Sequence, residues 1–151
     1  MKFLIFNGSL KADAESNTFA VCKMAQLAFE KLGHSCEIVT LRDLDYEGST
    51  DDVNDELKPH IMKMFNVDGV IFATPIWWGT HSCHIQAMLE RLDFIYSWAK
   101  DNKYQPFYNK VLGTLVSGGG DGFQHIHGNC YNFATNLGFT VPPSCNIESK
   151  A

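Results

Sequence analysis

Small polar side chains near the N-terminus have the types and the spacing of a phosphate site. They are Ser9, Ser16, Asn17 and Thr18. An apolar run precedes them at residues 3–6, and an amphipathic run follows from Phe19. Backbone N–H groups and the positive end of the helix dipole gather at a helix start, where hydroxyl and amide side chains add further donors. The pattern therefore predicts a phosphate-binding loop, with simple capping of the helix by Ser16 or Asn17 as the alternative.

Two later loops have the chemistry of a site for a flat ligand. The first loop comprises Pro75, Ile76, Trp77, Trp78 and Gly79. The second comprises Ser117, Gly118, Gly119, Gly120 and Asp121. Indole rings can form a flat wall, and glycines let backbone N–H groups approach a ligand closely. Together with a phosphate grip, these features are what flavin mononucleotide (FMN) requires; the alternatives are core or interface packing for the tryptophans and a flexible turn for the glycines.

The elements that must position these loops alternate between strand and helix patterns. Apolar runs predict strands over residues 3–6, 35–41, 68–74, 111–116 and 139–141. Helical spacing predicts helices over residues 18–32, 83–98 and 123–137, and a short one that starts near Pro59 and ends at Phe65. This alternation predicts an α/β domain with a doubly wound sheet of five parallel strands. The loops after the first, third and fourth strands then meet at the carboxyl edge of the sheet.

Length and composition indicate one globular domain over residues 1–151. A formal net charge of -5 without any basic cluster argues against nucleic acid as a partner. The five cysteines are scattered and form no C-x-x-C pair, which favours reduced thiols and a cytoplasmic location. No apolar run reaches the ~18 residues that span a bilayer, so we expect no membrane partner.

Histidines and cysteines form two short clusters that could suggest a metal site. One cluster is His81, Cys83 and His84, and the other is His125, His127 and Cys130. A structural metal needs three or four converging ligands, and neither spacing matches a standard zinc pattern. We therefore predict packing or contacts at the rim of the ligand edge, and no metal. The G-x-S-x-G pattern of a serine hydrolase is not in the sequence.

Three linked segments resemble the NAD(P)H-dependent FMN reductase family of the flavodoxin-like fold. They are GSLKADAESNT at residues 8–18, ATPIWWGTHSCHIQAMLERLD at 73–93 and VSGGGDGFQ at 116–124. The resemblance runs from Met1 to about Pro143, with the segments in the family's order and spacing. It implies strand order 2-1-3-4-5. The fold usually adds a helix after the fifth strand, and we expect that helix to be absent because the chain stops soon after this strand.

The resemblance also implies a role for each loop. The loop before Phe19 would bind the FMN phosphate through Ser9, Ser16, Asn17 and Thr18. The loop with the two tryptophans would flank the isoalloxazine ring through Pro75, Ile76, Trp77, Trp78 and Gly79. The glycine-rich loop would close the other side through Ser117, Gly118, Gly119, Gly120 and Asp121. No catalytic side chain is implied, because the flavin carries the redox chemistry.

The implied activity is an FMN-dependent oxidoreductase that takes hydride from NADPH or NADH and reduces a small acceptor such as a quinone or a flavin. One alternative is a flavodoxin, an electron carrier without its own NAD(P)H activity. Flavodoxins have a shorter phosphate loop, whereas six residues separate Ser9 from Ser16 here. A signalling receiver is a further alternative, but it needs clustered acids where this chain has Asn7, Gly8 and Ser9.

The predicted helix over residues 83–98 suggests self-association. At about 100° per residue, Ile85, Met88, Leu89, Leu92 and Tyr96 share the face toward the sheet. Phe94 and Trp98 lie nearly opposite, and a helix with one buried face does not need this second apolar stripe. We expect a homodimer, or a tetramer, that uses Phe94 and Trp98, in line with the resemblance. The alternative is that the linker over residues 101–110 folds back over these rings.

Overall fold

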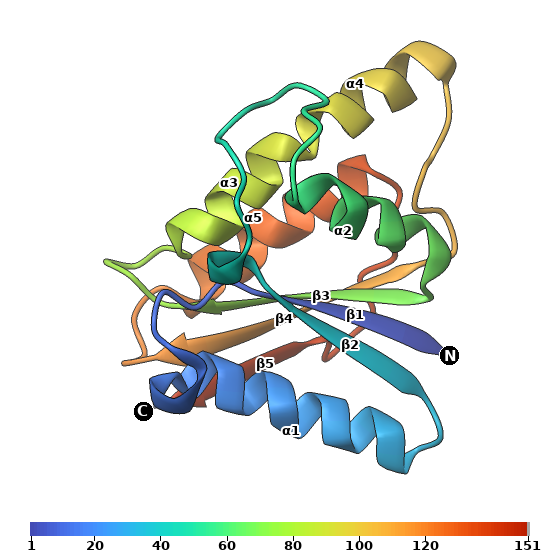
Figure 1. Ribbon diagram of the computed structural model, residues 1–151. Helices are drawn as coiled ribbons and strands as arrows, with labels where there is room; N and C mark the ends of the chain where they lie inside the picture. The colour runs from blue at the N-terminus through green and yellow to red at the C-terminus, as the bar shows by residue number, and fades with distance from the viewer. Residues whose placement is uncertain (151) are drawn as a thin grey trace.

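Five parallel strands in the order β2-β1-β3-β4-β5 form the centre of the computed structural model, which describes residues 1–150 (Figure 1). The strands are β1 (Lys2–Asn7), β2 (Ser35–Thr40), β3 (Gly69–Pro75), β4 (Val111–Gly118) and β5 (Asn146–Lys150). The three central strands are mostly buried, because helices cover both faces of the sheet. The flavodoxin-like fold and the strand order are confirmed.

The helices are divided unequally between the two faces of the sheet (Figure 1). One face carries only α1 (Asn17–Lys31). The other carries α2 (Leu57–Lys63), α3 (Cys83–Arg91), α4 (Asp93–Asn102) and α5 (Phe123–Asn136). Three short 3-10 turns complete the chain: η1 (Asp13–Glu15), η2 (Leu41–Asp43) and η3 (Met64–Asn66). The C-terminal helix is thus α5; it precedes β5, and no helix follows β5 within residues 1–150. No helix of this range is long and apolar enough to cross a membrane.

The last strand lies later in the chain than the pattern indicated. Residues 139–141 were expected as the strand, but only Thr140 forms a single bridge, to Val111. Pro142 and Pro143 follow and cannot donate ladder hydrogen bonds. The chain then pairs as β5, with Asn146 opposite Thr114. The apolar residues at 139–141 instead serve the core, where Phe139 stacks on Phe107 with ring centroids 4.5 Å apart.

The single helix expected over residues 83–98 is two helices. It breaks at Leu92, where the Ile95 amide donates to the Leu92 carbonyl three residues back at 3.1 Å. Ile85, Met88 and Leu92 are fully buried as predicted. Tyr96 was expected to face the sheet but is 38% exposed, because the break shifts the phase of α4 relative to α3.

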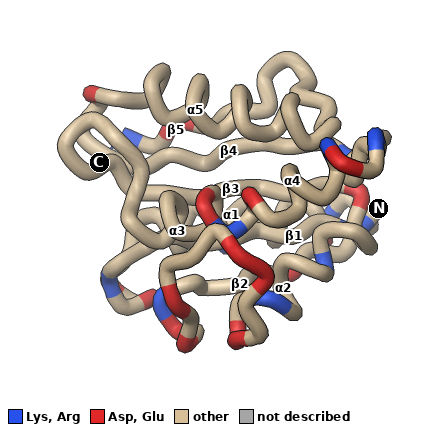
Figure 2. Tube along the Cα trace, turned by 90° about the horizontal axis from the view of Figure 1, so that it is seen from above, with Lys and Arg blue, Asp and Glu red and all other residues tan. Residues whose placement is uncertain are grey.

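A long loop over residues 44–56 is anchored on α3 by a buried arginine. Arg91 is 1% exposed, and its guanidinium donates to both carboxylate oxygens of Asp55 at 3.0 and 2.7 Å. It also donates to the Glu47 carbonyl at 2.6 Å. Acidic residues gather along this loop beside α2 and α3, as Figure 2 shows from above. This loop is therefore tied to α3 by one buried ion pair.

Candidate functional site

The loops after β1, β3 and β4 meet at the carboxyl edge of the sheet and line one cavity of about 170 Å³. Strand register brings them level, since Asn7 pairs with Ala73 and Pro75 pairs with Ser117. The predicted residues that line the cavity are Ser9, Ser16, Asn17, Thr18, Pro75, Ile76, Trp77, Ser117 and Gly118. Leu10, Lys11 and Glu15 also line it and were not predicted. All three lie between Ser9 and Ser16 in the sequence, and this position could have identified them as lining residues.

Buried hydroxyl groups hold the loop between β1 and α1 together and connect it to β4. The Ser16 hydroxyl donates to the Ser9 hydroxyl at 2.6 Å and accepts the Phe19 amide at 3.0 Å. Thr18 Oγ1 and Ser117 Oγ lie 2.7 Å apart, which joins the start of α1 to the end of β4. Ser16 therefore caps α1, as the simpler alternative proposed. The same hydroxyls also line the cavity, so capping and ligand binding do not exclude each other.

The loop after β1 is held in place by Asn7 and Gly8 at its start, which were not predicted to contact the ligand. The Ser9 amide donates to Asn7 Oδ1 at 3.1 Å, and Asn7 Nδ2 donates to Thr40 Oγ1 at 3.3 Å. A Cβ atom added to Gly8 would lie 2.6 Å from Ile85 Cγ1. Only glycine therefore lets α3 pack this close to the loop.

The loop between β3 and α3, residues 76–82, is called the aromatic loop, and it contains a tight turn that presents the two tryptophans differently. Trp77 and Thr80 exchange backbone hydrogen bonds of 2.8 and 3.0 Å. Trp78 and Gly79 between them have φ of 50° and 80°, as a type I′ turn requires. Trp77 lines the cavity, whereas Trp78 is 100% exposed and does not. A bulky residue at positive φ carries strain, which is common at functional sites.

The glycine-rich loop between β4 and α5, residues 119–122, packs against the aromatic loop through backbone contacts. The Ile76 amide donates to the Ser117 carbonyl at 2.9 Å. A Cβ atom on Gly122 would lie 2.5 Å from the Gly79 carbonyl oxygen, so the two loops touch there. Gly119 and Gly120 have open space where a Cβ atom would stand. Four further predicted residues do not line the cavity, although they lie close in the sequence to Trp77 and Gly118, which do: Gly79, Gly119, Gly120 and Asp121.

The histidines of the two clusters serve packing and loop contacts. Asn129 Nδ2 on α5 donates to His81 Nε2 at 2.9 Å, which ties the aromatic loop to α5. His127 Nδ1 lies 2.7 Å from Thr114 Oγ1. Burial lowers the pKa of both His81 and His127. Across residues 1–150, no three histidine, cysteine or acidic side chains are placed to hold a metal ion.

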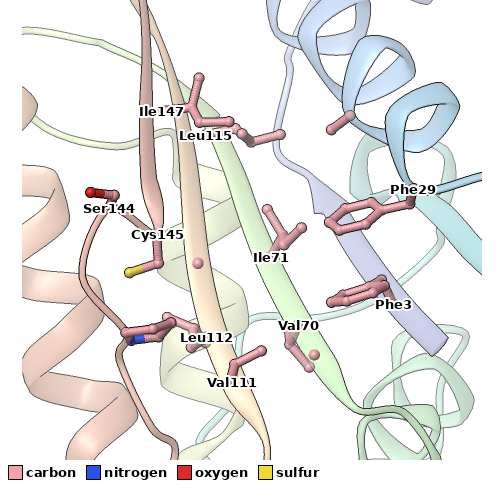
Figure 3. A pocket seen from close by; sticks show the side chains of 14 residues that line it. Phe3, Phe29, Val70, Ile71, Val111, Leu112, Leu115, Ser144, Cys145 and Ile147 are labelled. Atoms are coloured by element: carbon pink, nitrogen blue, oxygen red, sulfur yellow. The ribbon is translucent and has the colours of Figure 1, made fainter. Parts of the chain in front are cut away.

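A second cavity of about 220 Å³ lies on the α1 face of the sheet (Figure 3). Phe3 and Phe29 stack along one side with ring centroids 4.0 Å apart. Ile71, Leu115 and Ile147 line it from β3, β4 and β5. Its lining is almost wholly apolar and offers no grip for a charged ligand. The polar cavity at the carboxyl edge is therefore the candidate functional site.

Comparison with known proteins gives the same class as the fold and the site. The sequence pattern of the NADPH-dependent FMN reductase family matches residues 1–150, and the chain belongs to this family. It is 32% identical over 157 residues to 8-demethyl-8-aminoriboflavin-5'-phosphate synthase of Streptomyces davaonensis, covering 95% of this chain and 61% of that protein.

Solved structures extend the comparison. A crystal structure of RosB with the bound intermediate 8-demethyl-8-formylriboflavin-5'-phosphate is 30% identical, with a TM-score of 0.88, over 100% of this chain and 65% of that one. The apo form of an NADH:FMN oxidoreductase, EMOB, is 20% identical with a TM-score of 0.73, over 99% of this chain and 75% of that one, and shows the fold alone. The chain thus spans less than two thirds of the length of the synthase and of RosB.

Proposed function

We propose that the protein binds FMN and acts as an oxidoreductase that takes hydride from NADPH or NADH and reduces a small acceptor such as a quinone or a flavin. One observation carries this proposal. Buried hydroxyls at the start of α1, an indole wall and an open glycine loop line or border the same cavity. The family to which the chain belongs supports it.

The residues at the α1 end of the cavity fit a phosphate group. Ser9, Ser16 and Thr18 are buried but line the cavity, so their hydroxyls are shielded from bulk water. Asn17 is the first residue of α1, where backbone N–H groups are free to donate. A dianion would gain both from these donors and from the helix dipole.

The other two loops fit the flat ring of a flavin. Trp77 and Ile76 line the cavity from the β3 side, and Gly118 lines it from the β4 side. The empty positions beside Gly119 and Gly120 leave room for a ring to approach their backbone N–H groups. Such donors would stabilise negative charge that develops on the ring, as in an oxyanion hole.

When bound, FMN would supply the hydride and electron transfer, and the protein would supply position and electrostatics. The aromatic loop would exclude water from one side of the ring. No side chain needs to act as an acid or a base. Trp78, fully exposed at the tip of the turn, is free to cover a second small molecule.

An anaerobic visible spectrum of the purified protein tests this function. We expect a bound flavin whose visible absorbance bleaches within seconds after NADPH or NADH is added, on the order of usual turnover rates. Bleaching by dithionite but by neither nucleotide would favour the electron carrier. A protein that neither contains nor takes up FMN would overturn both functions.

A second candidate function follows from the 32% identity to the synthase. In that case a flavin phosphate would be the substrate, altered at the 8-position of its ring, as the name of that relative states. The two candidates differ in what happens to the flavin. Mass spectrometry of the flavin extracted from the purified protein distinguishes them: unmodified FMN supports the reductase, and an 8-formyl or 8-amino derivative supports the synthase.

Removing two hydroxyls should weaken FMN binding. The Ser16→Ala and Thr18→Ala double variant removes two hydroxyls that would turn from Ser9 and Ser117 toward a bound phosphate, so FMN affinity should fall by about tenfold to a hundredfold, as expected for hydrogen bonds to a charged group. Quenching of flavin fluorescence on titration measures it. Ser97→Ala, on the exposed side of α4, is the control. Unchanged affinity in the double variant would refute the phosphate assignment.

We propose a homodimer that uses α4. A groove of about 660 Å³ is lined by Met62, Phe65, Phe94, Ile95 and Trp98, together with Asp52 and Lys58. The linker covers Trp98 only in part: Tyr104 meets it edge-on with ring centroids 5.7 Å apart, yet Trp98 stays 51% exposed. The apolar lining and this exposed ring support association with a second copy.

Replacing the exposed Trp98 with a charged residue should disrupt the dimer. Trp98→Glu places a carboxylate in the apolar groove, and sedimentation should show a monomer at micromolar concentration where the parent is a dimer. Tyr108→Glu alters another exposed aromatic ring that does not line the groove, and it should leave the dimer intact. A parent protein that sediments as a monomer would contradict the proposal.

We also propose a cytoplasmic location and small molecules as partners. All five cysteines are free thiols, a state that the reducing cytoplasm maintains. The net charge of -5 disfavours binding to nucleic acid.

A further inference from the structure

Arg42 reaches from the end of β2 into the phosphate loop that follows β1. It lies in η2, and its Nη1 donates to the Lys11 carbonyl. Its Nε and Nη2 donate to Asp43 Oδ1 at 3.0 and 2.8 Å, which fixes the guanidinium. The Arg42 side chain is largely covered, with 26% exposed. These contacts restrict the Arg42 side chain to one orientation, unlike that of a mobile surface arginine.

The contact with Lys11 is connected to a hydroxyl of the site. The Lys11 amide donates to Ser9 Oγ at 3.2 Å, and Ser9 Oγ accepts the Ser16 hydroxyl at 2.6 Å. Arg42 thus holds the segment that orients Ser9, although Arg42 itself does not line the cavity.

Arg42 also compensates a carboxylate inside the phosphate loop. Asp13 lies between Lys11 and Ser16, and its Oδ1 is buried without any hydrogen bond. Arg42 Nη2 lies 3.5 Å from this oxygen. Asp13 does not itself line the cavity, but it lies in the chain between Lys11 and Glu15, which do, and an uncompensated carboxylate there would disfavour a phosphate dianion. The guanidinium offsets part of this negative charge at short range, at the one Asp13 oxygen that is buried.

We propose that Arg42 is a positioning residue that makes this site selective for phosphorylated flavins over unphosphorylated ones. It does so in two ways: it holds the Lys11–Ser9 segment in place, and it neutralises Asp13. The inference rests on the proposed binding of FMN and specifies how the site distinguishes FMN from riboflavin. Riboflavin has the same ring system but no phosphate, so it does not depend on either contribution.

Binding of FMN and of riboflavin to the same variants tests the inference. In Arg42→Ala, FMN affinity should fall about tenfold to a hundredfold, as for the loss of a charged contact, while riboflavin affinity changes less than about twofold. Arg42→Lys keeps the charge but not the hydrogen bonds of the guanidinium, and it should lose less FMN affinity than Arg42→Ala. Lys63→Ala removes a cation that is paired with Glu37 at 2.6 Å and does not line the cavity, and it should change neither affinity.

Removing the carboxylate as well should restore part of the binding. In the double variant Asp13→Asn with Arg42→Ala, FMN affinity should recover at least threefold over Arg42→Ala, because the uncompensated charge is gone. Equal losses for FMN and riboflavin in Arg42→Ala would show a merely structural role and overturn the inference. Unchanged FMN affinity in Arg42→Ala would also overturn it and leave the proposed function standing. A parent protein that binds no FMN would overturn both.

Discussion

Gly122→Ala should lower the free energy of unfolding by about 2–5 kcal/mol, because the residue has no room for a side chain and an unfavourable backbone for one. Gly122 has a φ of 102°, and a Cβ atom there would lie 2.5 Å from the carbonyl oxygen and 2.7 Å from the Cα atom of Gly79. All of these clashes are with backbone, which cannot turn aside as a flexible side chain can. Urea denaturation of the protein without added flavin measures the effect.

The same substitution should also weaken the site, because Gly122 is where the glycine-rich loop rests on the aromatic loop. Gly119→Ala is the matched control in the same loop. A Cβ atom there meets nothing within 4 Å, so unfolding should change by less than about 0.5 kcal/mol or the protein should become slightly more stable. If Gly122→Ala is as stable as Gly119→Ala, the close approach of the two loops is wrong.

Arg91→Met should lower the free energy of unfolding by about 3–5 kcal/mol, the usual loss when one partner of a buried ion pair is removed. Met keeps much of the volume of Arg91 but leaves Asp55 without its guanidinium partner. Asp55 Oδ1 also accepts the Leu57 and Lys58 amides at 3.1 and 3.2 Å, so the start of α2 depends on this carboxylate. Chemical denaturation at pH 7 measures the loss.

Lys63→Ala is the comparison for this prediction. Lys63 and Glu37 form a close pair at 2.6 Å, but their side chains are 42% and 50% exposed. Removing this pair should change stability by less than about 1 kcal/mol, since surface ion pairs contribute little. Equal effects of Arg91→Met and Lys63→Ala would contradict a special role for the buried pair.

The Arg91 pair should also make stability depend on acid pH. Hydrogen bonds from Arg91 are the main reason that the pKa of Asp55 lies below its ordinary value, with burial acting in the opposite direction. A lowered pKa in the folded state stabilises the protein above the unfolded pKa of about 3.9, and this stabilisation is lost as the pH falls through the folded value. The stability difference between the parent and Arg91→Met should therefore shrink below about pH 4. Denaturation at pH 7 and pH 3 measures it, and an equal difference at both would contradict the assignment.

Local patterns determined most of the secondary structure and the position of the polar loop before α1. The apolar runs at residues 68–74 and 111–116 correspond to β3 and β4, and the polar loop before Phe19 leads into α1. Such patterns are reliable because a buried strand must be apolar along its length and a helix start must satisfy its free N–H groups. In a doubly wound fold, the carboxyl edge then follows from the alternation of elements.

Other features depended on contacts between distant parts of the chain, and the sequence alone could not place them. The strand after Pro143 was missed because β5 is exposed and pairs through its backbone, which leaves little apolar pattern. The break at Leu92 was missed because both halves keep a helical spacing. Within the site, the exposed position of Trp78 depends on the turn between Trp77 and Thr80.

The tertiary structure alone decided how the loops are held in place. Arg91 with Asp55, and Gly122 with Gly79, are each far apart in the sequence and leave no periodic signal. Residue types and spacing along the chain therefore determined which loops could hold a phosphate and a flat ring. Packing decided which of their residues line the cavity, because that depends on strand register and on close backbone approach, which are properties of the folded chain.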